Sequence, residues 1–212
     1  MPAMALRKSW RWVGAFSPEL MLCVAHVRVG VIRRSWWAVW DGEQLHEGTR
    51  APFSLHLGPG QPIEATTGPA WTRKTPLRVR GTVLGHTVDA PGLLDESDGR
   101  HARRTAWWWS AGAGVTVDGV PVVWNLVEGM HPEENTVWLD GVPHPIAPQP
   151  FDGLDGVGEL RFTALATRAK RENYLVLSSD YEQPFGTFTG RLPTGQTLRE
   201  GHGVMERHEA LW

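Results

Sequence analysis

The stretch from His101 to Trp109 brings together residue types that could bind a small molecule. If this stretch is a strand, its period of two gives one face the side chains of His101, Arg103, Trp107 and Trp109. Indoles supply broad apolar surfaces, and arginine and histidine supply polar contacts, a combination typical of ligand pockets. The alternative is that both indoles fill the core while the charged residues lie at a solvated strand end.

A carboxyl group that could donate a proton occurs at Glu182, between Tyr181 and Phe185. Pro184 has no N–H to donate to a central ladder, so the chain is expected to bend or to lie at a sheet edge here. A glutamate desolvated among aromatic residues has a raised pKa and can act as a general acid, with Tyr181 and Phe185 as walls. The competing interpretation is an ion pair between Glu182 and an arginine such as Arg103 or Arg191.

The C-terminal residues contain a third group. On a strand, His202, Glu206 and His208 share one face. Two imidazoles and a carboxylate could ligate zinc or iron, or form a proton relay in which Glu206 is the donor and His208 the partner. The commoner outcome for such spacing is a structural ion pair at Glu206 and a surface position for His208, so we predict no metal.

These groups need strands to position them, and strand signals run through the chain. Asp118-Gly119 and Asp140-Gly141 each separate two β-rich runs, and such pairs predict hairpins because type I′ turns need positive φ. Asn125, near the end of the first hairpin, is a weaker pocket candidate. Further strands are predicted at residues 158–167, 174–181, 185–192 and 201–207. The only helix expected is a single turn near Ala166–Arg171.

Short strands with frequent turns predict an all-β fold with minimal helix. We expect an antiparallel lipocalin-like β-barrel or two strongly bent, packed sheets. The length of 212 residues predicts a single domain over residues 1–212. The Pro- and Gly-rich residues 49–75 are expected to form a loosely structured connection with one or two short strands.

Composition excludes several classes of protein. A net charge of −2 gives no basic field for nucleic acid or an anionic membrane, so neither is predicted as a partner. The single cysteine, Cys23, excludes an internal disulfide and is expected to be buried and inert.

No cofactor motif is found, so no cofactor is predicted. The N-terminal residues lack an export signal, which leaves a cytoplasmic protein as the expectation. Of the 12 tryptophans, packing is expected for four: Trp36, Trp40, Trp108 and Trp138.

Several sequence stretches together resemble the bacterial family known as domain of unknown function 2804. They follow one another along nearly the whole chain: Trp10-Arg-Trp-Val-Gly-Ala-Phe, Pro18-Glu-Leu-Met-Leu-Cys, Arg34-Ser-Trp-Trp-Ala-Val, Trp71-Thr-Arg-Lys, His101-Ala-Arg-Arg-Thr-Ala-Trp-Trp-Trp-Ser-Ala-Gly, Trp124-Asn-Leu-Val, Tyr181-Glu-Gln-Pro-Phe-Gly-Thr-Phe and Gly203-Val-Met-Glu-Arg-His. This resemblance implies no particular activity. More loosely, the chain is similar to lipocalin-like barrels of the carotenoid hydratase (hydroxyneurosporene synthase) group. That similarity implies Trp-rich walls and an acidic residue that protonates an alkene.

Three functions remain open from the sequence. The first is binding of a hydrophobic or partly polar small molecule in a Trp-lined interior pocket. The second is an enzyme on the same scaffold, an acid-catalysed hydratase, cyclase or isomerase that uses a buried carboxyl group beside indoles. The third is a carbohydrate-binding sandwich, which requires coplanar indoles on the surface.

Overall fold

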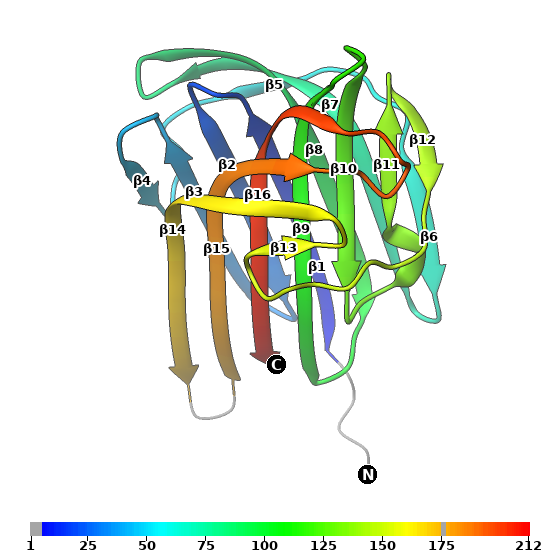
Figure 1. Cartoon of the computed structure of the whole chain (residues 1–212). Coiled ribbons are helices and arrows are strands. Elements are labelled where there is room, and N and C mark those ends of the chain that lie inside the picture. Colours follow the sequence, from blue (N-terminus) through cyan, green and yellow to red (C-terminus); the bar gives the residue numbers. More distant parts are fainter. Residues whose placement is uncertain (1–5, 175–176) are drawn as a thin grey trace.

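The protein, described by a computed structural model over residues 6–174 and 177–212, consists mostly of antiparallel strands (Figure 1). Residues 1–5, which entered the export prediction, lie outside the described residues. Residues 175–176, inside the predicted strand at 174–181, also lie outside them. One short 3₁₀ turn, η1 (Pro132–Glu134), is the only helix of the described ranges, and none of the described elements is a helix long and apolar enough to cross a membrane.

The first half of the chain forms one sheet, sheet A, and the second half forms another, sheet B. Sheet A has the order β4-β3-β2-β1-β8-β7-β5, with β6 paired to β7; its strands are β1 (Arg7–Phe16), β2 (Met21–Val29), β3 (Ile32–Trp40), β4 (Leu45–Gly48), β5 (Leu55–Leu57), β6 (Ile63–Thr67), β7 (Ala70–Val83) and β8 (His86–Arg100). Sheet B has the order β12-β11-β10-β9-β16-β15-β14-β13; its strands are β9 (Arg104–Thr116), β10 (Pro121–Glu128), β11 (Thr136–Leu139), β12 (Val142–Pro145), β13 (Gly156–Val157), β14 (Leu160–Tyr174), β15 (Leu177–Gly190) and β16 (Leu198–Leu211).

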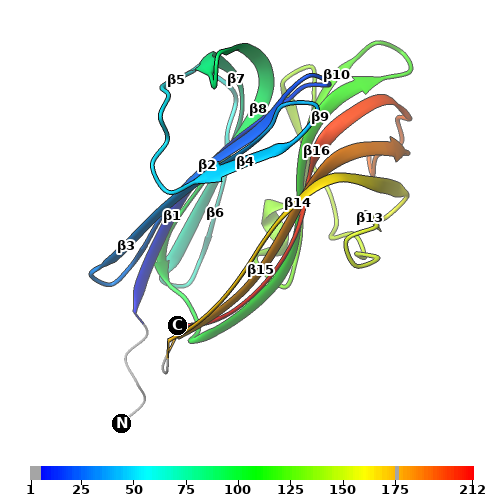
Figure 2. The same cartoon turned by 90° about the vertical axis from the view of Figure 1, so that its left-hand side faces the viewer.

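The two sheets face each other without closing into a barrel, so the second predicted form, two bent and packed sheets, is confirmed (Figure 2). Strands β14, β15 and β16 bend near their middles. In Figure 1 their lower halves run vertically, and their upper halves turn to the side. The β14–β15 ladder shifts register between Ala164 and Ala166, a bulge that favours bending. Pro184 lies where the β15–β16 ladder is interrupted. The bend predicted at this proline is confirmed.

Both predicted hairpins are present. Asp140 and Gly141 have φ of 49° and 78°, as a type I′ turn requires, and they join β11 to β12. Between β9 and β10 the turn is longer, and only Gly119 has positive φ, at 83°. The helical turn predicted at Ala166–Arg171 is wrong: these residues belong to β14 and pair with β15. Ladder pairing along the whole strand overrides the helical preference of alanine and arginine there.

Apolar side chains cover both faces of sheet A. Met21 and Cys23 point into the cluster between the sheets, whereas Leu22 points into a second cluster on the outer face. The chain between β4 and β7 covers that outer face, and its Phe53, Leu55 and Leu57 pack against the second cluster. Within the predicted loose connection 49–75, the structure has the short strands β5 and β6, and residues from 70 onward begin β7.

Candidate functional site

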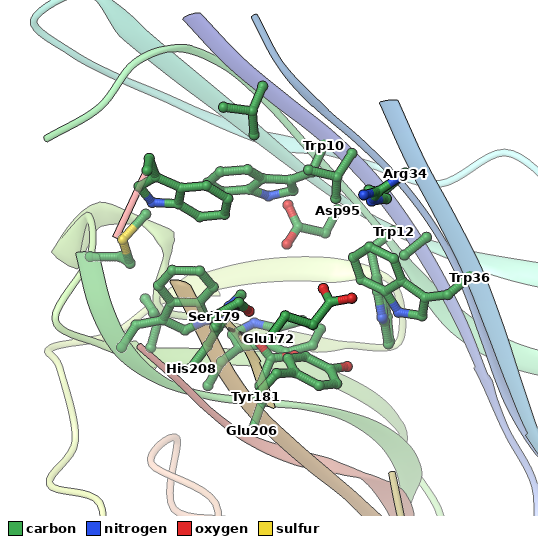
Figure 3. Close-up of a pocket in the computed structure, with 18 of the residues that line it drawn as sticks. Trp10, Trp12, Arg34, Trp36, Asp95, Glu172, Ser179, Tyr181, Glu206 and His208 are labelled. Carbon is green, nitrogen blue, oxygen red and sulfur yellow. Dashed lines mark hydrogen bonds between the residues drawn. The ribbon is translucent and has the colours of Figure 1, made fainter. Parts of the chain in front are cut away.

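A cavity of about 450 Å³ lies between the two sheets, near the start of β1 and the end of β16; Figure 3 shows residues that line it. Its walls are mainly aromatic and aliphatic, and both sheets contribute side chains to them. Figure 3 shows Asp95 reaching in from sheet A, while Tyr181, Glu206 and His208 lie on the side of sheet B. A mainly apolar enclosure with a few convergent polar groups is the usual form of a small-molecule site.

Indoles from two facing strands form the walls. Alternation along β1 directs Trp10 and Trp12 toward the cavity, and alternation along β9 does the same for Trp107 and Trp109. The rings of Trp10 and Trp107 are stacked with centroids 6.2 Å apart, and Trp12 meets Trp109 edge to face at 4.8 Å. Gly14 is needed beside Trp12, because a Cβ atom there would lie 2.2 Å from the indole Cη2.

Strand β16 brings a carboxyl group to the cavity wall. Glu206 is only 6% exposed, and it lies directly across from Trp109 in the β9–β16 ladder. The indole Nε1 of Trp107 donates to Glu206 Oε1 at 2.9 Å. The amide Nε2 of Gln183, beside the interrupted part of the β15–β16 ladder, donates to Oε2 at 2.7 Å. Both donors are neutral, and no ion pair among the described residues involves Glu206.

These surroundings make Glu206 a weak acid with a useful pKa. Burial raises its pKa to about 7, even though the hydrogen bonds from Trp107 and Gln183 favour the charged form. Near neutral pH the carboxyl group therefore exists in both protonation states. A group with a pKa near the working pH is suited to general acid or base catalysis.

His208 lies two residues after Glu206 on the same face of β16. Burial lowers its pKa to about 4, so the imidazole is neutral near neutral pH. Its Nε2 shares a hydrogen bond of 2.8 Å with Ser179 Oγ, and its ring lies 4.4 Å from that of Trp107. His208 therefore supports the indole that donates to Glu206, and no hydrogen bond joins it to Glu206 itself.

The opposite wall carries a buried charged group, the triad Lys74–Asp95–Glu134. The ammonium of Lys74 lies 2.5 Å from Asp95 Oδ1 and 2.9 Å from Glu134 Oε2. Lys74 and Asp95 are paired across β7 and β8, and η1 brings Glu134 to them from sheet B. Although burial alone lowers the pKa of Lys74, the two carboxylates raise it above its usual value. The lysine is therefore charged, and the triad joins the two sheets.

The predicted ligand-binding residues divide into two groups. Trp107, Trp109 and Tyr181 line the cavity. The other four, His101, Arg103, Asn125 and Phe185, do not line it. The ring of His101 stacks on that of Trp10 with centroids 5.2 Å apart, and Arg103 is exposed. Asn125 accepts a hydrogen bond from Trp109 Nε1 at 2.8 Å, and Phe185 is buried in the core. His101 and Arg103 precede β9, so the alternation assumed for them does not apply. Asn125 therefore holds the wall residue Trp109 in place without lining the cavity itself.

The predicted proton donors also separate. Glu206 and His208 share one face of β16, as expected, and both line the cavity. Glu182 is half-buried outside the lining, because alternation along β15 turns its neighbours Tyr181 and Gln183 inward. His202 lies beyond the bend of β16, with Nδ1 3.7 Å from Glu200. Within the described ranges no group of three His, Cys, Asp or Glu side chains is arranged to hold a metal ion.

Several site residues escaped the sequence analysis. Trp36, expected in packing, lines the cavity together with Trp10 and Trp12. Trp10 and Trp12 have the same period-two spacing as Trp107 and Trp109, so the pattern that predicts cavity walls on β9 also occurs on β1. Nothing in local sequence connects Lys74 to Asp95, since their pairing depends on the β7–β8 register. Cys23 is buried as expected, and burial raises its pKa to about 12.

The fold and cavity define an all-β protein built from two packed antiparallel sheets with an indole-walled interior site. The family model described as domain of unknown function (DUF2804) matches residues 69–212, and the chain belongs to this family. The resemblance noted from the sequence is confirmed over this range. A search of curated proteins finds no match.

Three solved structures are similar to this chain. A structure from Nitrosomonas europaea described as an AttH is 14% identical to this chain, covers 95% of this chain and 92% of its own, and has a TM-score of 0.50. CghA with Sch210972 is 9% identical, with 98% and 88% covered and a TM-score of 0.48. Kievitone hydratase from Nectria haematococca is 10% identical, with 94% and 88% covered and a TM-score of 0.46. At such identities, similarity to the AttH structure concerns the fold alone.

Proposed function

We propose that this protein binds a largely apolar, unsaturated small molecule between its sheets and transfers a proton to it from Glu206. The observation that carries the proposal is the environment of Glu206: a buried carboxyl group at the cavity wall, held by two neutral donors and raised in pKa to about 7. Binding of an apolar molecule alone would not require a desolvated carboxyl group without a cationic partner.

The chemistry follows from the groups around the cavity. The π electrons of an alkene take the proton of Glu206 and form a C–H bond, which leaves a carboxylate and a carbocation. Trp107 and Gln183 already donate to the two carboxylate oxygens, so the charged product needs no rearrangement. The electron-rich faces of the wall indoles favour the cation. The Glu206 carboxylate then takes a proton back and regenerates the acid. Removal of the proton from a carbon next to the cation gives an isomer, and removal from a water molecule that has added to the cation gives a hydrate. If a second alkene of the ligand adds to the cation, removal from the new cation gives a ring.

Deuterium incorporation tests this proposal whichever product forms. The purified protein is incubated in D₂O with an aryl alkene, isoeugenol, and with an aliphatic triene, β-myrcene, and the products are followed by mass spectrometry. We expect the wild type to place deuterium on carbon, and Glu206→Gln to lose about 10²–10⁴-fold of the rate, the usual contribution of a positioned proton donor.

Glu182→Gln is the matched control, because Glu182 lies on the adjacent strand and outside the cavity lining. It should exchange deuterium at the wild-type rate. The proposal is contradicted if the wild type transfers no deuterium to either alkene, or if Glu206→Gln transfers it as fast as the wild type.

The second candidate is binding without chemistry, which the aromatic cavity supports by itself. It predicts that each alkene binds the wild type and Glu206→Gln with the same affinity, and that neither protein places deuterium on it. The carbohydrate-binding sandwich has less support. In the part of the chain that the structure describes, Trp71 is the only exposed tryptophan, at 40%, and it has no second exposed indole beside it to form a platform.

A further inference from the structure

The triad opposite Glu206 contains two carboxylates and one ammonium. Lys74, Asp95 and Glu134 are all buried and all line the cavity. Lys74 contacts one oxygen of each carboxylate, Asp95 Oδ1 and Glu134 Oε2. Buried charges are stable only when they are paired, so this arrangement lacks one positive charge.

Among the described residues, no second lysine or arginine forms an ion pair with the triad, although Arg34 also lines the cavity. Neither Asp95 nor Glu134 forms an ion pair with any described lysine or arginine except Lys74. The other buried lysine, Lys8, donates to the carbonyl oxygen of Ala102 at 2.7 Å and lies over the Trp212 ring instead. The second carboxyl group of the triad is therefore left without an ion-pair partner of its own and is open to a cation from outside the chain or to a proton.

Aromatic rings adjoin the place where a cation would bind. Trp12 lies directly across from Asp95 in the β1–β8 ladder, just as Lys74 does in the β7–β8 ladder, so the three side chains form a row facing the cavity. Trp109 meets Trp12 edge to face, and it lines the cavity too. A cation beside Asp95 would therefore contact indole as well as carboxylate, the two groups that recognise organic cations.

We propose that the ligand supplies the missing charge: it carries a protonated amine that binds to Asp95 and Glu134 beside Trp12, while its apolar part lies along the indoles. This inference rests on the proposed function for the location of the ligand, but not for the reaction. Burial raises the pKa of Asp95 and the charge of Glu134 raises it further, with Lys74 opposing both, so a second positive charge at this place is electrostatically favourable.

Three probes with one carbon skeleton test the proposal by isothermal titration calorimetry near neutral pH. They are trans-cinnamylamine, trans-cinnamyl alcohol and trans-cinnamate, which differ in their head group alone. We expect the amine to bind the wild type at least about ten-fold more tightly than the alcohol, because the amine alone can form a partly desolvated ion pair and a cation–π contact. The carboxylate should bind most weakly.

Two variants each remove one negative charge with little change in shape. Asp95→Asn leaves the contact between Lys74 and Glu134, and Glu134→Gln leaves that between Lys74 and Asp95, so either variant keeps one ion pair of the triad. Both should reduce the preference for amine over alcohol to about two-fold or less. Asp98→Asn is the control, since Asp98 lies on the same strand but outside the lining and pairs with Arg7. It should keep the wild-type preference.

The proposal is overturned if the wild type binds amine and alcohol equally, if it prefers the carboxylate, if it binds none of the three, or if both charge-removing variants keep the preference. Failure of the reaction looks different. A protein that selects the amine but transfers no deuterium to an alkene retains this subsite and loses the proposed catalytic role of Glu206.

Discussion

The cavity has two polar walls that are similarly buried and differ in how they hold charge. On sheet B, Glu206 receives hydrogen bonds from neutral donors only. On the opposite wall, Asp95 and Glu134 share the ammonium of Lys74. Burial raises the pKa of both Glu206 and Asp95; two neutral donors oppose that rise at Glu206, and the ammonium of Lys74 opposes it at Asp95. The first wall is therefore suited to exchange a proton. The second, in which a charged lysine lies between two carboxyl groups, is suited to bind a further positive charge.

This difference separates two roles within one site. A proton donor must change its charge during a reaction, so a strong ion pair would hold it in one state. A binding group for a cation must present negative charge, and Lys74 favours the charged form of Asp95 against the effect of burial. Glu206 belongs to sheet B and Asp95 to sheet A, and Glu134 reaches Asp95 from η1 of the sheet B half. A ligand in the cavity would contact both kinds of carboxylate.

The largest effect is expected from breaking the charged wall. Lys74→Met leaves Asp95 and Glu134 buried without a cation, and removal of one partner from a buried ion pair typically costs about 3–5 kcal/mol. Urea unfolding near neutral pH measures this loss in the free energy of unfolding. The combined variant Lys74→Met, Asp95→Asn, Glu134→Gln should recover most of it. Equal stability of Lys74→Met and wild type would show that the triad is not the buried charged group described above.

A smaller, pH-dependent effect is expected at Glu206. Because its folded pKa is raised, the protonated carboxyl stabilises the fold at low pH, and this contribution is lost as the pH rises from the unfolded value of 4.5 through about 7. Relative to wild type, Glu206→Gln should therefore gain about 2–3 kcal/mol in the free energy of unfolding between about pH 5 and pH 8.

Comparison with Glu206→Gln at each pH removes the contribution of His208, which both proteins share. The pKa of His208 is lowered to about 4, so its neutral form is favoured in the fold and stability falls as the pH drops from 6.5 toward 4. Urea unfolding of both proteins at several pH values measures the difference. A stability difference that does not change with pH would mean that Glu206 titrates normally.

The smallest effect concerns one hydrogen bond. Trp107→Phe removes the indole donor to Glu206 Oε1, and a hydrogen bond of this kind contributes about 0.5–1.5 kcal/mol, so the pKa of Glu206 should rise by up to about one unit above 7. Trp109→Phe is the matched control, because its indole donates to Asn125. A pH titration of the Glu206 carboxyl in each variant checks this, and a fall in pKa in Trp107→Phe would contradict the assignment.

Alternation along single strands was enough to predict part of the site. It placed Trp107 with Trp109, and Glu206 with His208, on shared faces, because a period of two needs only the strand itself. It could not choose between Glu182 and Glu206. That choice depends on which face of β15 and which of β16 turns inward after the bend at Pro184, and the bend arises from contacts among three strands.

Features that need two strands or two sheets were out of reach. The row Trp12–Asp95–Lys74 exists only once the registers of β1, β8 and β7 are fixed. Glu134 joins it from sheet B through η1. The same limit explains the wrong helical turn at Ala166–Arg171, where local preference was overridden by pairing with β15. Turn chemistry, by contrast, is local: both Asp-Gly pairs lie in hairpins as predicted, although only Asp140-Gly141 has the positive φ at both residues that a type I′ turn requires.

The central claim is that Glu206 is a carboxyl group with a pKa near neutrality, and its titration measures this directly. The protein is labelled with ¹³C at the side-chain carboxyl of glutamate, and chemical shifts are followed by NMR against pH, with Glu206→Gln identifying the signal of Glu206. We predict a midpoint at about 7. A midpoint near the ordinary value of 4.5 would contradict the account.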